Sequence, residues 1–192
     1  YLPGNVATVI ATPAAGYGFV NWKEGATVAS TSASYSFTVA AARNLVANFQ
    51  LLKATAITVT AVNGQIGQKV TLTATLKDNV SKALLSGKSV QFSIDGVNVG
   101  VPVLTVSTGK ATLSYLIAEG TTTGSHTIGA SFGGDNTYLP GAGSGALTVA
   151  KGTSKITFSA AAGTSNATVT FSAKIVNGSA AAIAGVTAPS RC

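Results

Sequence analysis

The chain has 192 residues, of which 46% are hydrophobic and only 9% are charged, and its formal net charge is +7. The hydrophobic content excludes intrinsic disorder, and small and β-branched residues with so little charge favour short strands and turns. The basic residues are spread singly from Lys23 to Arg191. Nucleic-acid-binding proteins concentrate such residues on one face, so we expect no nucleic-acid partner. A diffuse positive charge is compatible with weak, salt-dependent attraction to an anionic cell-wall polymer.

The cysteine count and the lack of long apolar runs exclude several kinds of site and segment. Cys192 is the only cysteine, which excludes an internal disulfide and a cysteine-based metal site. No apolar run approaches the ~20 residues of a membrane helix, and no segment resembles a signal peptide. Tyr1 leads almost directly into strand-like sequence, so we expect this chain to be a piece of something longer.

The first unit, residues 1–50, contains four short segments predicted to be β-strands, three of them because apolar and polar residues alternate and one that is rich in aromatic residues. These segments are Ala7–Ala11, Tyr17–Trp22, Ser34–Val39 and Leu45–Phe49. Tyr17, Phe19 and Trp22 place three aromatic rings within six residues. We expect these rings to form the core of a small β unit; in the alternative, Tyr17 and Trp22 form a platform on which a sugar stacks.

The run from Ala11 to Trp22, together with Ser34–Val39 and Leu45–Phe49, resembles the divergent internalin-type B-repeat of bacterial surface proteins. The resemblance covers nearly all of the first unit and implies a small β domain. The family pattern normally has about one more strand before this point. We therefore expect the first unit to be a partial, N-terminally truncated B-repeat.

The second unit, residues 53–150, has the most regular alternation of apolar and polar residues in the chain. About seven short strands are predicted at a spacing of ~8–12 residues, which is typical of an antiparallel sandwich. Each predicted strand has one apolar face, so two sheets must close on each other to bury these faces. The dipeptide Asp95-Gly96 predicts a tight hairpin turn.

The clearest block of the second unit runs from Gly124 to Tyr138: a glycine, an alternating strand, and the turn Gly133-Gly134-Asp135-Asn136. With Gly67–Thr75 and Gly109–Leu113, this block is similar to the bacterial Ig-like domains found as tandem repeats in large surface proteins. The resemblance spans the unit. It implies an Ig-like β-sandwich whose partners are the neighbouring repeat domains of the same chain.

The third stretch, residues 151–192, repeats the opening of the second with an offset of 99 residues. Ile57 falls on Ile156 and Ala74 on Ala173, and such an offset is the mark of a repeat array. After about Ala184 the match ends, so only the first two strands of an incomplete second Ig-like repeat are expected, poorly packed or with a borrowed partner. The predicted fold class is all-β: an antiparallel Ig-like β-sandwich flanked by a small truncated β unit and this incomplete repeat.

The sequence shows no catalytic constellation. His126 is the only histidine, and it is in phase with the apolar residues of its strand, which predicts a structural histidine bonded to a neighbouring loop. The five carboxylates are isolated in predicted turns or strand ends, whereas glycosidases need two that face each other across a cleft. These carboxylates are Glu24, Asp78, Asp95, Glu119 and Asp135. We expect no catalytic residue and no cofactor.

Asp135 and Asn136 are the candidate ligands of a metal ion, since their side-chain oxygens suit Ca²⁺. A calcium site needs 6–8 oxygen ligands, and no acidic cluster accompanies this pair. We therefore expect the two residues to serve turn geometry and predict no metal site.

Two functions are compatible with these features. The first is a non-catalytic structural or spacer module of a large secreted or cell-surface bacterial protein, stalk-like or adhesin-like, and hence extracellular. The alternative is a carbohydrate- or ligand-binding accessory module of a larger extracellular protein or enzyme. Exposure of Tyr17 and Trp22 on a common face would favour the alternative.

Overall fold

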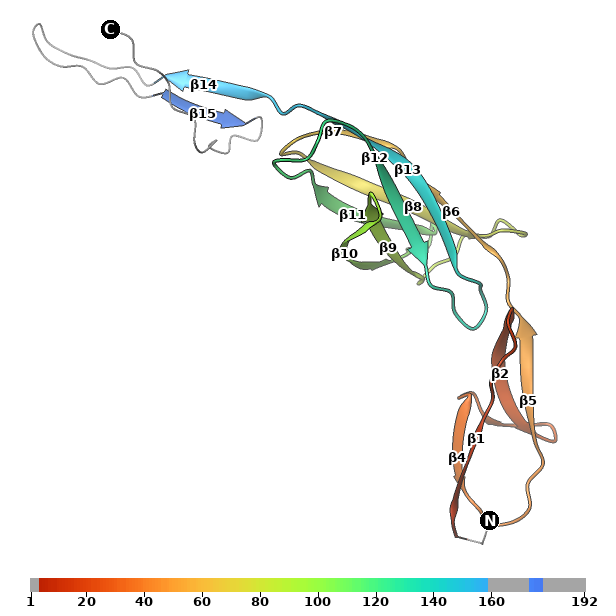
Figure 1. Ribbon diagram of the computed structural model, residues 1–192. Coiled ribbons are helices and arrows are strands. Elements are labelled where there is room, and N and C mark those ends of the chain that lie inside the picture. Colours follow the sequence, from red (N-terminus) through yellow and green to blue (C-terminus); the bar gives the residue numbers. More distant parts are fainter. Residues whose placement is uncertain (1–3, 159–172, 178–192) are drawn as a thin grey trace, which may run out of the picture.

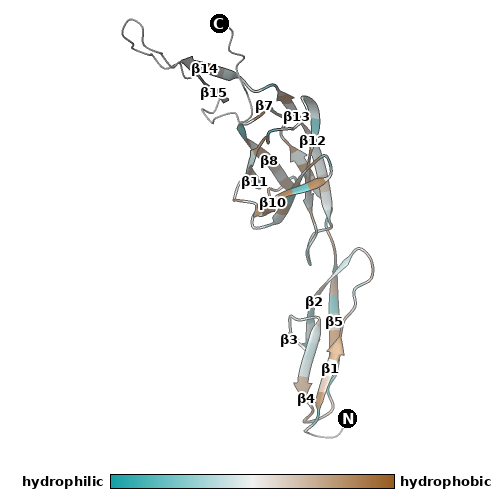
Figure 2. Ribbon diagram, turned by 60° about the vertical axis from the view of Figure 1, so that its left-hand side comes forward, coloured by the Kyte–Doolittle hydropathy of each residue, from teal (hydrophilic) through white to brown (hydrophobic). Residues whose placement is uncertain are grey.

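A computed structural model describes residues 4–158 and 173–177, and every regular element in this part of the chain is a β-strand (Figure 1). The strands form two β units and a short hairpin that follow one another end to end. Figure 2 shows this arrangement from another side, with hydrophobic and hydrophilic residues interspersed along the strands of both units. The predicted all-β class is confirmed.

The first unit consists of two small antiparallel sheets. Strand β1 (Val6–Ile10) pairs with β4 (Ser34–Thr38). Strand β2 (Tyr17–Glu24) lies between β3 (Thr27–Ser30) and β5 (Leu45–Leu51). The unit thus has one strand more than the sequence predicted, because β3 is short and carries no alternation of buried and exposed residues.

A β-bulge in β2 sets the direction of its aromatic rings. Phe19 lies opposite Phe49, whereas the next pair is Asn21 with Asn48, so one residue of β2 between them is extra. The extra residue shifts the phase of the strand. Phe19 and Trp22, three positions apart, therefore share the buried face, with their ring centroids 5.9 Å apart.

The second unit is a sandwich of a five-stranded sheet, in the order β10-β9-β12-β13-β7, and a three-stranded sheet, in the order β11-β8-β6. All neighbours are antiparallel except β7 and β13, which are parallel. The strands are β6 (Thr55–Val59), β7 (Val62–Gln65), β8 (Lys69–Asp78), β9 (Ser89–Ile94), β10 (Val97–Leu104), β11 (Lys110–Leu116), β12 (Gly124–Phe132) and β13 (Gly141–Ala150). These eight strands confirm the predicted Ig-like sandwich, with one strand more than the expected seven.

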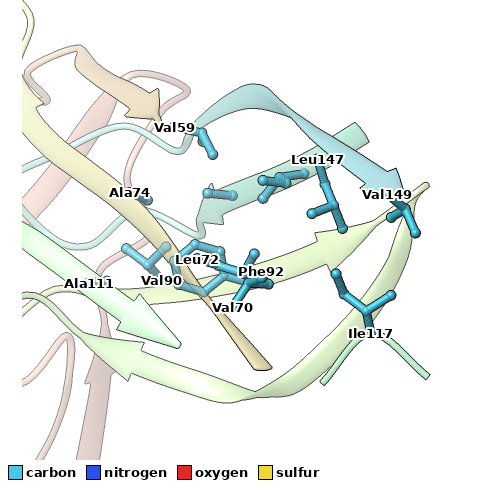
Figure 3. Close-up of a cluster of buried hydrophobic side chains, with 12 residues drawn as sticks. Val59, Val70, Leu72, Ala74, Val90, Phe92, Ala111, Ile117, Leu147 and Val149 are labelled. Atoms are coloured by element: carbon cyan, nitrogen blue, oxygen red, sulfur yellow. The ribbon is translucent and has the colours of Figure 1, made fainter. Parts of the chain in front are cut away.

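The core of the sandwich lies between the two sheets (Figure 3). Leu72 of β8 comes from one sheet, and Phe92 of β9 and Ile128 of β12 come from the other; none of the three is exposed to solvent. Phe132, at the end of β12, is 5% exposed and belongs to an adjoining cluster. The inward phase that the sequence predicted for β8, β9 and β12 is confirmed.

The turn between β9 and β10 has the predicted hairpin geometry. Asp95 has a φ of 49° and Gly96 a φ of 83°, and positive φ at both central residues defines the type I′ turn that matches the twist of antiparallel strands. Aspartate tolerates this region better than most residues, and glycine adopts it without strain.

The third stretch repeats the strand pairing of the second. Strands β14 (Ser154–Phe158) and β15 (Ala173–Asn177) pair in the register Ser154 with Asn177. In the sandwich, β6 and β8 pair in the register Thr55 with Asp78, which is the same pair 99 residues earlier. The repeat offset therefore holds for backbone pairing as well as for sequence. The expectation that the match ends after about Ala184 lies outside the described residues.

Candidate functional site

The two aromatic residues considered for sugar binding lie in different surroundings. Trp22 is 8% exposed and belongs to the core of the first unit, where its indole Nε1 donates a hydrogen bond to the carbonyl oxygen of Ala33 at 3.3 Å. Tyr17, at the start of β2, is 47% exposed. The pair therefore does not form the exposed common face that stacking on both rings requires.

His126 joins two loops of the sandwich. Its Nδ1 lies 2.6 Å from Oδ2 of Asp95, and its Nε2 lies 2.8 Å from the carbonyl oxygen of Thr122. A carboxylate and a carbonyl only accept hydrogen bonds, so this geometry favours the protonated imidazole, in which both ring nitrogens donate. Asp95 foremost, and then Thr122, raise the pKa of His126. This geometry matches the predicted structural role.

The other carboxylates also have local partners. Asp78, which is 3% exposed, accepts hydrogen bonds from the backbone amides of Val80 and Ser81, and the amide of Ser81 is the largest contribution to its lowered pKa. Glu24 pairs with Arg43 at 2.7 Å, a hydrogen bond that lowers the pKa of this carboxyl. Carboxyls of lowered pKa are ionised at neutral pH, whereas a general acid needs a raised one.

Asp135 organises the turn that follows β12. Its Oδ1 accepts hydrogen bonds from the amides of Thr137 at 2.8 Å and Tyr138 at 2.9 Å, and its Oδ2 lies 2.5 Å from Nζ of Lys88. Burial raises the pKa of Asp135, but the hydrogen bonds from Lys88 and from the two amides outweigh burial and lower it.

This arrangement does not suit a cation at Asp135 and Asn136. The oxygens of Asp135 already face two amides and the ammonium group of Lys88, which a metal ion would have to displace. Within the described residues, no three or more histidine, cysteine, aspartate or glutamate side chains are grouped as metal ligands. The contacts of Asp135 are those of a turn, and the absence of a metal site stays a prediction.

The same turn contacts the segment that leaves the first unit. The amide of Lys53 donates to the carbonyl oxygen of Thr137 at 2.9 Å, and the amide of Leu139 donates to the carbonyl oxygen of Lys53 at 2.9 Å. Nε2 of Gln50 donates to the main-chain oxygen of Asn136 at 2.8 Å. We call this turn, residues 133–139, the junction loop.

Gly18 allows the junction loop to come this close. A Cβ atom at position 18 would lie 2.3 Å from the main-chain oxygen of Asn136 and 2.8 Å from Cδ2 of Leu52. Sequence reasoning missed this contact. Its one signal was a glycine within the predicted strand Tyr17–Trp22, since such a glycine often marks a close approach of another backbone.

A groove opens in the first unit between β1, β4 and the segment that leads into β5. It has a volume of about 660 Å³ and is lined by Trp22, Phe37, Arg43 and Leu45, among others. The guanidinium carbon of Arg43 lies 4.6 Å from the centroid of the Phe37 ring, within the range of a cation–π contact. The groove thus has an apolar wall beside Arg43, whose guanidinium donates to Glu24 and to the hydroxyl of Tyr35.

Among the described residues, no helix is long and apolar enough to cross a membrane. What the structure presents is a pair of β units joined by hydrogen bonds, in which Asp78, Asp95 and Asp135 bond to turns and loops and His126 bonds to Asp95. This combination defines a class of protein: an Ig-like β-sandwich module that follows a small β unit.

Two family models match the chain and identify its two units. Residues 1–53 match the divergent InlB B-repeat domain, and residues 55–150 match the bacterial Ig-like domain (group 3). The chain belongs to the group 3 bacterial Ig-like family and carries a divergent InlB B-repeat ahead of the sandwich. Both resemblances inferred from the sequence are confirmed. The chain is thus built from modules of the kind that bacterial surface proteins use.

The solved structures that the chain matches share little sequence with it. The fibronectin(III)-like modules of CbhA from Clostridium thermocellum are 17% identical, with a TM-score of 0.38, over 78% of this chain and 87% of that one. A putative membrane-anchored protein from Corynebacterium diphtheriae is 24% identical, with a TM-score of 0.39, over 65% and 29%. Domains 4–9 of the surface layer protein SbsC are 16% identical, with a TM-score of 0.31, over 90% and 29%. No curated protein matches the chain.

Proposed function

We propose that this chain is a non-catalytic spacer that holds other parts of a large secreted or cell-surface bacterial protein at a distance, as in a stalk or an adhesin. Its units are residues 1–50, residues 53–150 and the repeat that begins at residue 151. The observation that carries the proposal is the end-to-end order of the units (Figure 1), with the first two joined by backbone hydrogen bonds through Lys53.

The chemistry of the polar groups supports a structural role. Hydrogen-bonded partners lower the pKa values of Glu24, Asp78, Asp95 and Asp135, so none of these four is poised to donate a proton at neutral pH. The repeated register of β14 and β15 supports a second sandwich in series. An array of this kind grows in length by one unit at a time.

Small-angle scattering tests the spacer. The sample pair is the full chain and a version in which residues 53–150 are duplicated in tandem, with the junctions kept. We expect the maximum dimension of the particle to grow by the length of one sandwich. If the duplicated version is instead a more compact particle of unchanged length, the spacer proposal is wrong.

A binding module is the second candidate, and the groove in the first unit favours it. The ligand would be a carbohydrate or another small molecule that contacts Phe37 and competes with Glu24 and Tyr35 for the guanidinium of Arg43. Trp22 lines this groove and is the only tryptophan, so its fluorescence reports occupancy. A panel of cell-wall glycans that changes neither this emission nor the heat of mixing would contradict this candidate, whereas a change abolished by Arg43→Ala would support it.

A further inference from the structure

We infer that the junction loop is a docking element that binds the segment leaving the first unit. The first unit and the sandwich then form one rigid body. The inference goes beyond the spacer role, because modules in series can equally be joined by free hinges. It assigns a partner to the loop: the extended backbone at Lys53 together with the end of the sheet formed by β2 and β5.

The junction loop binds Lys53 through main-chain hydrogen bonds. Lys53 uses both its amide and its carbonyl, bonding to Thr137 and Leu139, and it forms a parallel bridge with Tyr138. The segment thus adds to the loop as a short β-strand adds to a sheet edge. Main-chain hydrogen bonds supply the affinity in this mode of recognition. The side chain of Lys53 therefore contributes little to this contact.

The loop is also held by contacts that lie wholly within the sandwich. Within the sandwich, Asp135 accepts the amides of Thr137 and Tyr138, and the amide of Asp135 donates to the carbonyl of Tyr138 at 2.9 Å. Lys88, next to β9, holds the carboxylate and lies 5.2 Å from the ring centroid of Tyr138. A loop ordered in this way loses little conformational entropy when it docks.

The linker has no unbonded residue between the two units. The amide of Leu52 donates to Gly16 in the first unit at 2.8 Å, Lys53 bonds to the junction loop, and the carbonyl of Ala54 accepts the amide of Asn79 at 2.9 Å. Of three successive residues, Leu52 is therefore bonded to the first unit, and Lys53 and Ala54 are bonded to the sandwich. A hinge needs residues whose φ and ψ are free to change, and these bonds oppose such change.

Gly18 is the position that decides whether docking succeeds. A side chain there would meet the main-chain oxygen of Asn136, which belongs to the other unit. Gly133 lies within the junction loop and supplies the matched control. A Cβ atom at Gly133 meets nothing within 4 Å, and neither glycine has a positive φ that would strain an alanine.

The test is nuclear magnetic resonance relaxation of the amides of the full chain. We expect residues of β2 and β5 to tumble with the same correlation time as residues of β8 and β12. In Gly18→Val, we expect this common time to split into two shorter ones, while Gly133→Ala keeps the common time. Independent tumbling in the unsubstituted chain would overturn the inference and would leave the scattering test of the spacer unaffected.

A second variant separates undocking from damage to the first unit. Asp135→Ala changes only the sandwich and removes the acceptor that holds the loop, and we expect the two correlation times to split there as well. The amide chemical shifts of β1 to β4 should stay unchanged in this variant. If Asp135→Ala and Gly18→Val both keep one common correlation time, the junction loop does not hold the units together.

Discussion

Truncation of Phe132 to alanine tests the direction in which β12 faces. The ring is 5% exposed and packs with Leu76 and Leu85, so almost its whole apolar surface is removed from water. At about 25 cal/mol per Å², the burial lost on truncation is worth about 3 kcal/mol. The cavity left behind adds to this loss, and we expect the free energy of unfolding of the sandwich to fall by about 3–5 kcal/mol.

Urea unfolding of the full chain measures this loss, followed through the amide resonances of β8 and β12. The fluorescence of Trp22 is unsuitable, because this residue lies in the first unit. With an m-value of about 1.5 kcal/mol per M, the midpoint should fall by about 2–3 M. The control is Leu104→Ala in β10, where the side chain is 63% exposed and the loss should stay below ~0.5 kcal/mol. A loss under ~1 kcal/mol for Phe132→Ala would refute the inward phase of β12.

Three further predictions concern polar and backbone contacts of the sandwich. The raised pKa of His126 means that its stabilisation is complete below the unfolded value of ~6.5 and is lost as the pH rises through the folded value. The lowered pKa of Asp95 means that its stabilisation is complete above ~3.9 and is lost as the pH falls through the folded value. The pair should therefore stabilise most between about pH 4 and pH 6.5, and thermal melts of His126→Gln over pH 3–9 should lack this maximum. In Gly143→Ala, the new Cβ would lie 2.4 Å from the main-chain oxygen of Ile57, so hydrogen exchange in β6 and β13 should become faster; unchanged exchange would contradict this contact. Gly96→Ala forces an alanine into the left-handed region, and calorimetry should show a loss of about 1–2 kcal/mol; a neutral result would mean that the turn is not type I′.

The strands of the sandwich were predictable because each one buries a single face. In β8, Val70, Leu72 and Ala74 alternate with threonines, and the structure buries these three residues and leaves the threonines partly or fully exposed. The hairpin at Asp95 was predictable for a local reason, since glycine, asparagine and aspartate adopt positive φ more readily than other residues. The 99-residue repeat, read from the sequence, also agrees with the register in which β14 and β15 pair.

The aromatic cluster of the first unit was predicted only in part. Strict alternation puts Tyr17 and Phe19 on one face and Trp22 on the other, and the bulge between Phe19 and Asn21 reverses this for Trp22. The bulge arises from the pairing of β2 with β5, which are more than 20 residues apart in the chain. No pattern within β2 itself signals the position of the extra residue.

The junction loop was also predicted only in part: its turn was expected from the sequence, but its contact with the first unit was not. The sequence identified residues 133–136 as a turn, and the structure shows Asp135 stabilising that turn with two backbone amides. What the turn contacts was not predictable, because the amide of Lys53 and the main-chain oxygen of Asn136 have the same chemistry in every sequence. Only the absence of a side chain at Gly18 left a trace of the contact in the sequence.

The sequence by itself determined the all-β class, the Ig-like sandwich and its inward faces, the repeat, and the structural role of His126. These follow from side-chain periodicity and from the backbone preferences of single residues, which are local properties. Tertiary structure alone decided the parallel pairing of β7 with β13, the bulge in β2 and the docking of the first unit on the sandwich. These depend on main-chain atoms that meet across long separations in the chain, and main-chain atoms are the part of a protein that its sequence does not vary.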